Sequence, residues 1–236
     1  MHSLLDAFRD ETLVISQKMS GPELAKLAMT EMRIILYTAD RIPLLLNLYT
    51  SKDRIKKALT VTEDAAEKYS DIKLSDLPIY KCHEEDVSGS LNAGVTISSA
   101  GCGIYRIQPL SDTEAVMHCY PDSVLAQDLS KGSDVPVTVA VGTSPRFFLT
   151  AASKRRSGQT SVPDGTQIII RGTVSASQRH PEGPFMTYRG LSEVSDYPVM
   201  SVESVKIAEN GVYHTIITGP KYDESLTVIR AAEELI

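Results

Sequence analysis

The hydrophobic pattern of this chain changes near residue 88, and that change limits the folds it can adopt. Beyond this point, short runs rich in β-branched residues are separated by turn residues such as Gly, Pro, Asp and Ser. Strand and helix patterns do not alternate regularly, which indicates an α+β fold with a largely antiparallel sheet or barrel. The expected strands are SLNAGVTISS, CGIYRIQPL, EAVMHCY, VPVTVAVG, TQIIIRGTVSA, YPVMSVESVKIA and VYHTIITG.

Helix signals dominate residues 1–70 and recur in later segments. Pro22 suits the first turn of GPELAKLAMTEM, and Ser51 is the expected N-cap of SKDRIKKALTVTEDAAEKYSD, with a break near Thr60. IILY and PLLLNLY are ambiguous and suit buried strands or extended segments. Ser144, followed by proline, predicts a helix start at SPRFFLTAAS. PDSVLAQDL and the acidic, amphipathic YDESLTVIRAAEELI complete the expected helices.

Composition excludes several classes of protein. The chain has 236 residues and a formal net charge of -6, and Lys154-Arg155-Arg156 is its one cationic triplet, so nucleic-acid binding is not expected. No apolar segment approaches the roughly 20 residues of a membrane span, and the N-terminus lacks a signal pattern, which predicts a cytoplasmic protein. Cys82, Cys102 and Cys119 include no CxxC pair, so reduced thiols are expected rather than disulfides or a zinc site.

The segment HPEGPF holds a carboxylate in an unusual setting. Pro181 and Pro184 bracket Glu182 and Gly183, so the backbone is stiff on both sides and permissive in the middle. This pattern predicts a turn after a strand. The residues alone leave open whether Glu182 serves chemistry or whether the segment is only a tight corner.

The order of several motifs resembles that of the UbiD family, the decarboxylases and reversible carboxylases that use prenylated FMN. The resemblance runs from about Met1 to the end of the chain and implies a split-barrel, flavin-binding core related to flavin reductases. It also implies action on unsaturated or aromatic carboxylic acids. The expected divisions are an N-terminal helical or mixed segment (1–87), the split barrel (88–220) and a C-terminal interface helix (221–236). The motifs are NLYTSKDRIKKAL, LSDLPIYKC, LNAGVTISS, GIYRIQPL, VPVTVAVGTSPRFFLTAAS, HPEGPF and VYHTIITG.

The same resemblance implies a set of site residues. Arg106 matches the family's catalytic arginine after Ile-Tyr, and Glu182 matches its first catalytic carboxylate. A guanidinium offers a two-pronged donor to a carboxylate, which suits the pair to hold an acidic substrate. The rival interpretation of Arg106 is a surface ion pair at a strand edge. The expected cofactor-binding residues are Ile104, Tyr105, Thr150, Ser153, Lys154, Arg155 and Arg156.

Departures from the family pattern concern proton donation and metal binding. The family's second acid, five residues after the first, corresponds to Thr187, whose hydroxyl is too weak an acid for that role. The positions of the metal-binding Asn and His correspond to Gly101 and to a site at or near Ser123, and the Glu segment is replaced by SKRRSGQTSVP. A divalent metal is therefore not expected. Lys154-Arg155-Arg156 would meet the cofactor phosphate directly, or form only a solvated basic loop.

Three functions stay open on this basis. The chain is a carboxy-lyase or the flavin-binding half of a split decarboxylase, a non-catalytic partner or regulatory subunit of a complete UbiD-like enzyme, or a module that binds FMN. The sequence stops before the family's second domain, so a homo-oligomer or a UbiD-like partner is expected to supply it. Tyr222, Leu226, Ile229 and Ile236 are expected to form the apolar interface face of the last helix, unless that helix folds back on the barrel.

Overall fold

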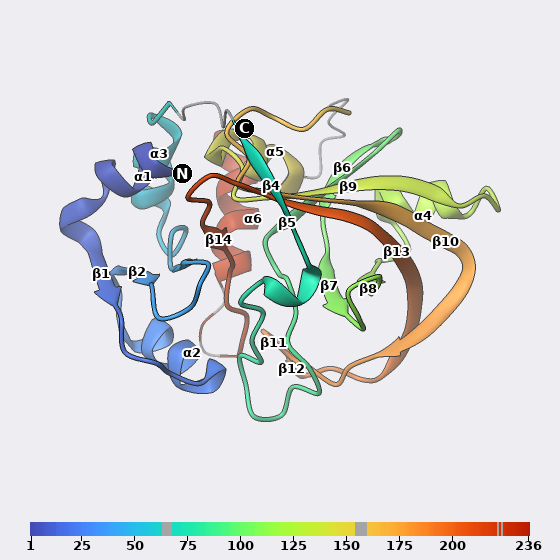
Figure 1. Cartoon of the computed structure of the whole chain (residues 1–236), viewed down its shortest axis with the longest axis horizontal. Coiled ribbons are helices and arrows are strands. Elements are labelled where there is room, and N and C mark those ends of the chain that lie inside the picture. Colours follow the sequence, from blue (N-terminus) through green and yellow to red (C-terminus); the bar gives the residue numbers. More distant parts are fainter. Residues whose placement is uncertain (63–67, 154–159, 221, 223) are drawn as a thin grey trace.

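The computed structural model describes residues 1–62, 68–153, 160–220, 222 and 224–236, in which a curled antiparallel sheet stands beside a small sheet and a group of helices (Figure 1). The fold is α+β, as the sequence predicts. The helices are α1 (His2–Ala7), α2 (Gly21–Thr30), α3 (Lys52–Leu59), α4 (Val124–Leu129), α5 (Pro145–Ala152) and α6 (Glu224–Leu235), with 3-10 turns at Arg9–Glu11 and Leu74–Asp76. The strands are β1 (Thr12–Ile15), β2 (Ile34–Tyr37), β3 (Leu44–Leu46), β4 (Tyr69–Ile72), β5 (Gly94–Ser98), β6 (Gly101–Ile104), β7 (Arg106–Pro109), β8 (Glu114–His118), β9 (Val135–Val141), β10 (Ile168–Glu182), β11 (Met186–Thr187), β12 (Gly190–Leu191), β13 (Ser195–Ala208) and β14 (Tyr213–His214).

The large sheet has the strand order β6-β5-β9-β10-β13-β8-β7, with β4 also paired to β13. Its two longest strands, β10 and β13, form a curved antiparallel pair (Figure 1). Their register shifts between Arg171 and Gly172 and again between Val174 and Arg179, and such irregularities bend strands and increase their twist. β9 pairs only with the first part of β10, so the end of β10 leaves β9 and curls over the sheet with β13.

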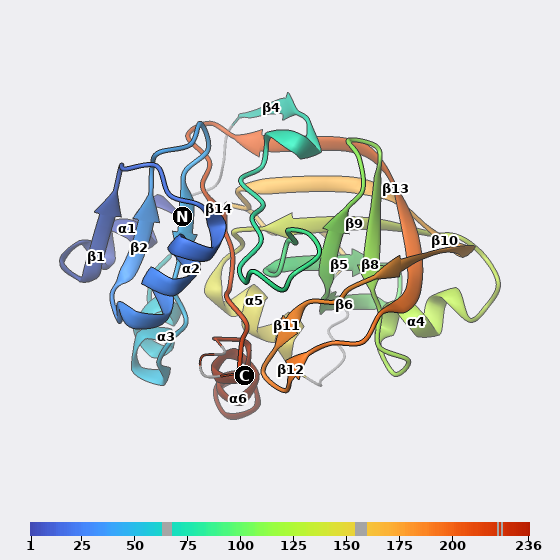
Figure 2. The ribbon, with the colours of Figure 1, turned by 90° about the horizontal axis from the view of Figure 1, so that it is seen from below.

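The small sheet, of order β1-β2-β3-β14, joins the N-terminal part of the chain to the segment that follows the large sheet. Successive residues of β2 pack into two different hydrophobic clusters. Ile35 belongs to the cluster inside the curled sheet, and Ile34 belongs to the cluster around α5 and α6. This follows from the alternation of side chains along a strand. Seen from below, α6 lies against α5, between the two sheets (Figure 2). No helix in the described ranges is long and apolar enough to cross a membrane.

The helices that were predicted to begin after Ser51 and Ser144 do begin there. Ser51 accepts a hydrogen bond from Arg54 N at the start of α3, and Ser144 accepts one from Phe147 N at the start of α5. α2 begins with a capping box, in which the Ser20 hydroxyl bonds the backbone of Glu23 while the Glu23 carboxylate bonds the backbone of Ser20.

Other expectations for the chain were wrong in detail. Residues 1–70 are less helical than predicted and include β1, which was not predicted, while IILY and PLLLNLY contain β2 and β3, as one of their two interpretations allowed. The helix after Ser51 ends at Leu59, at the predicted break, but Tyr69–Ile72 forms β4 instead of continuing as a helix, because these residues pair with Val205–Ala208 at the edge of the large sheet. Long-range pairing of this kind overrides local propensity.

The last helix buries a different face from the one predicted. Val228, Ala231 and Ala232 are buried against α5 and α3, while Ile229 is 39% exposed. Small alanine side chains let the helices approach closely, so α6 folds back on its own chain. The contact of its predicted apolar face with another subunit stays a prediction, and Ile229 on that face is left uncovered by this chain. Tyr222, just before the helix, donates a hydrogen bond from its hydroxyl to Asn47 Oδ1 at 2.7 Å.

Candidate active site

Three charged or titratable side chains meet where three strands begin or end. Arg106 is the first residue of β7 and His118 the last of β8, and the two are direct partners in the antiparallel register. Direct partners present their side chains on the same face of a sheet. Glu182 is the last residue of β10 and reaches this face because the end of β10 curls over with β13.

Glu182 is the centre of the cluster. Arg106 Nε donates to Oε1 at 3.0 Å, and His118 Nδ1 lies 2.7 Å from Oε2. The Glu182 side chain is 0% exposed, whereas those of Arg106 and His118 are 11% and 9% exposed. The convergence of Arg106 and Glu182 that the family resemblance implies is therefore present, and the pair is buried rather than at a surface edge.

The local structure of HPEGPF differs from the predicted turn. His180, Pro181 and Glu182 continue β10 and pair with Ser195–Tyr197 of β13, and the chain turns only at Gly183, whose φ is +99°. Glu182 therefore has the fixed backbone of a paired strand. Gly183 supplies the left-handed conformation that side-chain-bearing residues rarely adopt.

Aromatic rings surround the cluster. The Arg106 guanidinium lies over the Phe185 ring, with Cζ 3.6 Å from the ring centroid, a geometry that stabilises a buried cation. The His118 ring contacts Tyr197, Tyr120 and Phe185, with centroid separations of 4.1, 4.9 and 5.4 Å. These rings fix the orientation of both side chains toward Glu182.

Arg106 has an unused donor. Burial lowers the pKa of Arg106, while the charges of Glu182 and Asp86 oppose that shift, and a guanidinium stays protonated at neutral pH. Its Nη2 is buried and has no hydrogen-bond partner among the described residues. A buried donor without a partner is costly, so this nitrogen suits an oxygen of a bound acid.

Asp86 anchors the loop beside Arg106. Its Oδ2 accepts hydrogen bonds from the backbone N–H groups of Cys82 and His83, and its Oδ1 accepts one from Met186 N at 2.7 Å. The loop is thereby tied to the segment that follows Glu182. The sequence offered no local signal for this contact, since Asp86 and Met186 are 100 residues apart.

His118 is the residue that the sequence analysis did not include in the site. A signal was present, because GIYRIQPL and EAVMHCY are short strands separated by the loop SDT. A hairpin centred on Asp112 pairs position 106 with position 118, as the register confirms. Recognition of that hairpin would have placed a histidine opposite the arginine.

Thr187, at the position of the family's second acid, has a local structural role. Its hydroxyl donates to Gly190 O at 2.9 Å and accepts from Arg189 N at 3.1 Å, which closes the hairpin of β11 and β12. The side chain thus stabilises the turn beside the cluster and offers no acid to it.

The described residues expected to bind a cofactor lie in two places, at the end of β6 and at the end of α5. Ile104 ends β6 and is half-buried. Tyr105 is buried, and its hydroxyl accepts a hydrogen bond from Leu125 N at 3.1 Å, so it belongs to the core. Contact of Tyr105 with a ligand would therefore use its backbone.

Thr150 and Ser153 lie at the end of α5. Their hydroxyls donate to backbone oxygens of the helix, Thr150 to Arg146 O and Ser153 to Thr150 O, each at 2.8 Å. Lys154, Arg155 and Arg156 lie outside the described residues.

The positions that match the family's metal ligands have other uses. Ser123 caps α4 by accepting a hydrogen bond from Ala126 N, and Gly101 opens β6 with φ +137°. Across the described ranges, no group of three or more His, Cys, Asp or Glu side chains is arranged to hold a metal ion.

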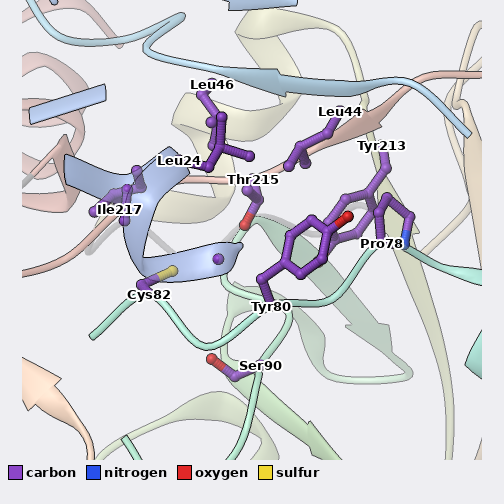
Figure 3. Close-up of a pocket in the computed structure, with 12 residues that line it drawn as sticks. Leu24, Leu44, Leu46, Pro78, Tyr80, Cys82, Ser90, Tyr213, Thr215 and Ile217 are labelled. Atoms are coloured by element: carbon purple, nitrogen blue, oxygen red, sulfur yellow. The ribbon is translucent and has the colours of Figure 1, made fainter. Parts of the chain in front are cut away.

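A small cavity lies between α2, β3, β14 and the segment that includes Tyr80 and Cys82 (Figure 3). Its lining is mainly apolar, with Leu24, Leu46 and Tyr213 among the side chains that face it. The volume of about 20 Å³ has room for about one water molecule. A cavity of this size is too small for a flavin or an aromatic acid.

Comparison with known families gives a match over most of the chain. The model of the 3-octaprenyl-4-hydroxybenzoate carboxy-lyase (UbiD) Rift-related domain matches residues 54–159 and 153–221. These two stretches include all three residues of the cluster.

Solved structures share the fold at low sequence identity. The UbiD-class enzyme HmfF from Pelotomaculum thermopropionicum, in an evolved dimeric form with prFMN, is 19% identical with a TM-score of 0.84, over 98% of this chain and 71% of that one. Vanillic acid decarboxylase from Sedimentibacter hydroxybenzoicus is 12% identical with a TM-score of 0.86, over 98% and 67%. The apo 3,4-dihydroxybenzoic acid decarboxylase from Enterobacter cloacae is 14% identical with a TM-score of 0.79, over 97% and 66%. This chain spans about two thirds of their length.

Proposed function

Since this chain belongs to the UbiD family, we propose that it is a flavin-dependent carboxy-lyase, or the flavin-binding subunit of one, that acts on unsaturated or aromatic carboxylic acids. The observation that carries the proposal is the buried Arg106–Glu182 pair with its unused Nη2 donor. Arg106 orients the substrate carboxylate through that donor, and Glu182 holds the guanidinium in place and handles the proton.

The cofactor of this proposal is prenylated FMN or FMN, because structures of HmfF are known in complex with prFMN and in complex with FMN. The unused Arg106 Nη2 donor fits an anionic, oxygen-bearing ligand, which is the substrate carboxylate in this proposal. Ile104, the backbone of Tyr105, Thr150 and Ser153 would hold the flavin and its phosphate. When bound, the flavin supplies an electron sink for the electron pair left by the departing carboxylate.

The matched structures extend beyond the length of this chain, and we propose that a partner subunit or a second copy completes the site. Support comes from exposed apolar side chains around the cluster. Tyr120 and Leu191 are 62% and 52% exposed, and Tyr188 and Val194 are 43% and 56% exposed. A group of large apolar side chains left in water usually marks an interaction surface. In this proposal the curled sheet is a split barrel of the flavin-reductase type.

The test is reconstitution with FMN and prenylated FMN, followed by absorbance spectra and turnover assays with a panel of aromatic and acrylic acids. Assays run with and without a complete UbiD-family partner. We expect a bound flavin and CO₂ release that is lost in R106M and in E182Q. Flavin binding with equal turnover in these variants would contradict the assigned roles.

A second candidate is a non-catalytic subunit of a complete UbiD-like enzyme. It is favoured by Thr187, whose hydroxyl closes a hairpin where the family has an acid, and by Ser123, which caps a helix near the metal position. This candidate predicts no turnover by the chain itself and a change in the partner's turnover on mixing. The same reconstitution distinguishes the two candidates. If the chain is a non-catalytic subunit, the R106M variant changes the partner's turnover as much as the wild-type chain does.

A further inference from the structure

Glu182 has no route of its own to solvent. Its side chain is 0% exposed, and within the part of the chain that the structure describes its carboxylate contacts Arg106 and His118. A guanidinium does not release its proton in proteins. An imidazole does exchange protons near neutral pH, and the His118 side chain keeps 9% of its surface exposed. Of the two side chains in contact with Glu182, His118 is therefore the one able to pass on a proton from solvent.

We infer that His118 takes over the proton-supplying task of the family's second acid, as a relay that acts through Glu182. This inference rests on the proposed function. Three features of the structure support it: the contact of 2.7 Å between His118 Nδ1 and Glu182 Oε2, the burial of Glu182, and the use of the Thr187 hydroxyl in the β11–β12 hairpin.

Other groups near the cluster hold their protons too firmly to serve. Burial raises the pKa of Tyr120 and of Tyr197. Burial also raises the pKa of the Cys82 and Cys119 thiols to about 12. A proton donor works best when its pKa is close to the working pH, so these phenols and thiols are poor relays.

The proton balance of the step is simple. The bond between the substrate carbon and its carboxylate breaks, CO₂ leaves, and the electron pair stays on the carbon. That carbon then takes a proton from the Glu182 carboxyl group, and Glu182 regains one from Nδ1 of the His118 imidazolium. Water reprotonates the neutral imidazole, so one proton is consumed for each CO₂ released and no oxidant or reductant is needed.

The test compares H118N with H118F. An asparagine amide places an N–H donor near the position of Nδ1 but relays no proton, while phenylalanine preserves the ring contacts and removes the donor. We expect H118N to fold with near wild-type stability. In reconstituted enzyme its kcat falls about 100-fold or more, with KM little changed and with loss of the limb of the pH profile that reports the imidazolium. A H118A variant should regain turnover with added imidazole.

A second readout uses the chain without cofactor. Infrared difference spectra against E182Q isolate the carboxyl band of Glu182, and its pH dependence is compared in wild type and H118N. We expect the pH at which the band titrates to shift in H118N. The titratable and charged groups that face the ring are Glu182 from β10, Arg106 from β7, Tyr197 from β13 and Tyr120, so Y120F is the matched control and should leave the band unchanged.

The outcomes separate the inference from the proposed function. An unshifted Glu182 band in H118N, or turnover by H118N with the wild-type pH profile, overturns the relay. A second outcome is a shifted Glu182 band in H118N combined with no turnover by wild type on any acid tested. This outcome supports a proton route between His118 and Glu182 and contradicts the carboxy-lyase proposal.

Discussion

Two histidines at strand positions show how differently this fold treats the same side chain. His118, at the end of β8, keeps one ring nitrogen on Glu182 and lies among Tyr120, Phe185 and Tyr197. His214, in β14, makes edge contacts with the rings of Tyr49 and Phe148, whose centroids are 5.3 and 5.7 Å away.

Both histidines pack against aromatic rings, and their environments differ in whether a charged partner is present. Within the described residues, Nε2 of His214 is buried without a hydrogen-bond partner, and burial lowers the pKa of His214 to about 4. His118 has a carboxylate partner and a strip of exposed surface. A buried carboxylate is thus what distinguishes a histidine suited to chemistry from one that belongs to the core.

Removal of that carboxylate has the largest expected effect. In E182A the Arg106 cation and the His118 ring lose their shared partner inside the fold. Breaking a buried pair from one side costs about 3–5 kcal/mol, so the urea midpoint should fall sharply. E193A, at the exposed acid downstream, is the control and should unfold like wild type. Equal stability of the two variants would show that Glu182 does not organise the cluster.

Acidic pH should lower the free energy of unfolding because His214 is buried in its neutral form. Its ordinary pKa is 6.5 and burial lowers it to about 4. As pH falls from 6.5 toward 4, the unfolded chain takes up a proton that the folded chain refuses, so stability is lost over this window and is unaffected above it. At about 1.4 kcal/mol per pKa unit, the full loss is about 3.5 kcal/mol.

The measurement is the free energy of unfolding as a function of pH in wild type and H214F. Phenylalanine keeps the contacts with Tyr49 and Phe148 but cannot take up a proton. We expect H214F to lose this part of the acid sensitivity whatever its absolute stability, while H2Q, at an exposed histidine, keeps it. Identical pH slopes in wild type and H214F would contradict the assignment of His214 to the neutral core.

Some features of this structure could be predicted from the sequence and others could not. Local signals, such as the caps at Ser51 and Ser144, were sufficient for the helix starts. Arg106 and Glu182 came from the family resemblance, while the contact of His118 with Glu182 joins residues 64 apart. Such contacts depend on strand register and on the bend of β10, which hydrophobic pattern alone does not define.

The face of α6 that packs inside this chain was not identified from the sequence, for a related reason. A pattern of large apolar residues suggested an outward interface, yet the helix buries Val228, Ala231 and Ala232. Close packing against another helix favours small residues, and which neighbour a helix meets is decided by the tertiary fold. The sequence therefore predicted that a helix ends the chain but not which side of it is covered.

The ring beneath Arg106 tests how much the aromatic enclosure contributes. F185L keeps an apolar side chain but removes the π face that lies 3.6 Å from Arg106 Cζ. A desolvated cation–π contact contributes about 2 kcal/mol, and we expect a loss of that order in chemical unfolding. Y188L is the matched control, because Arg189 Cζ lies 5.1 Å from the centroid of a ring that is 43% exposed. A larger loss in Y188L than in F185L would mean that burial does not set the strength of these contacts.

Thr187 gives the smallest expected effect. T187V preserves the shape of the side chain and removes a hydroxyl that bonds Gly190 O and Arg189 N. An intramolecular hydrogen bond contributes about 1 kcal/mol net, and the residue is only half-buried, so the thermal midpoint should fall slightly. If His118 supplies the proton, T187V retains its turnover and pH profile in the same assay in which H118N loses both. Strong loss of turnover in T187V, without loss of fold, would contradict this. It would mean that position 187, where the family has its second acid, is needed for proton supply and that His118 has only a structural role.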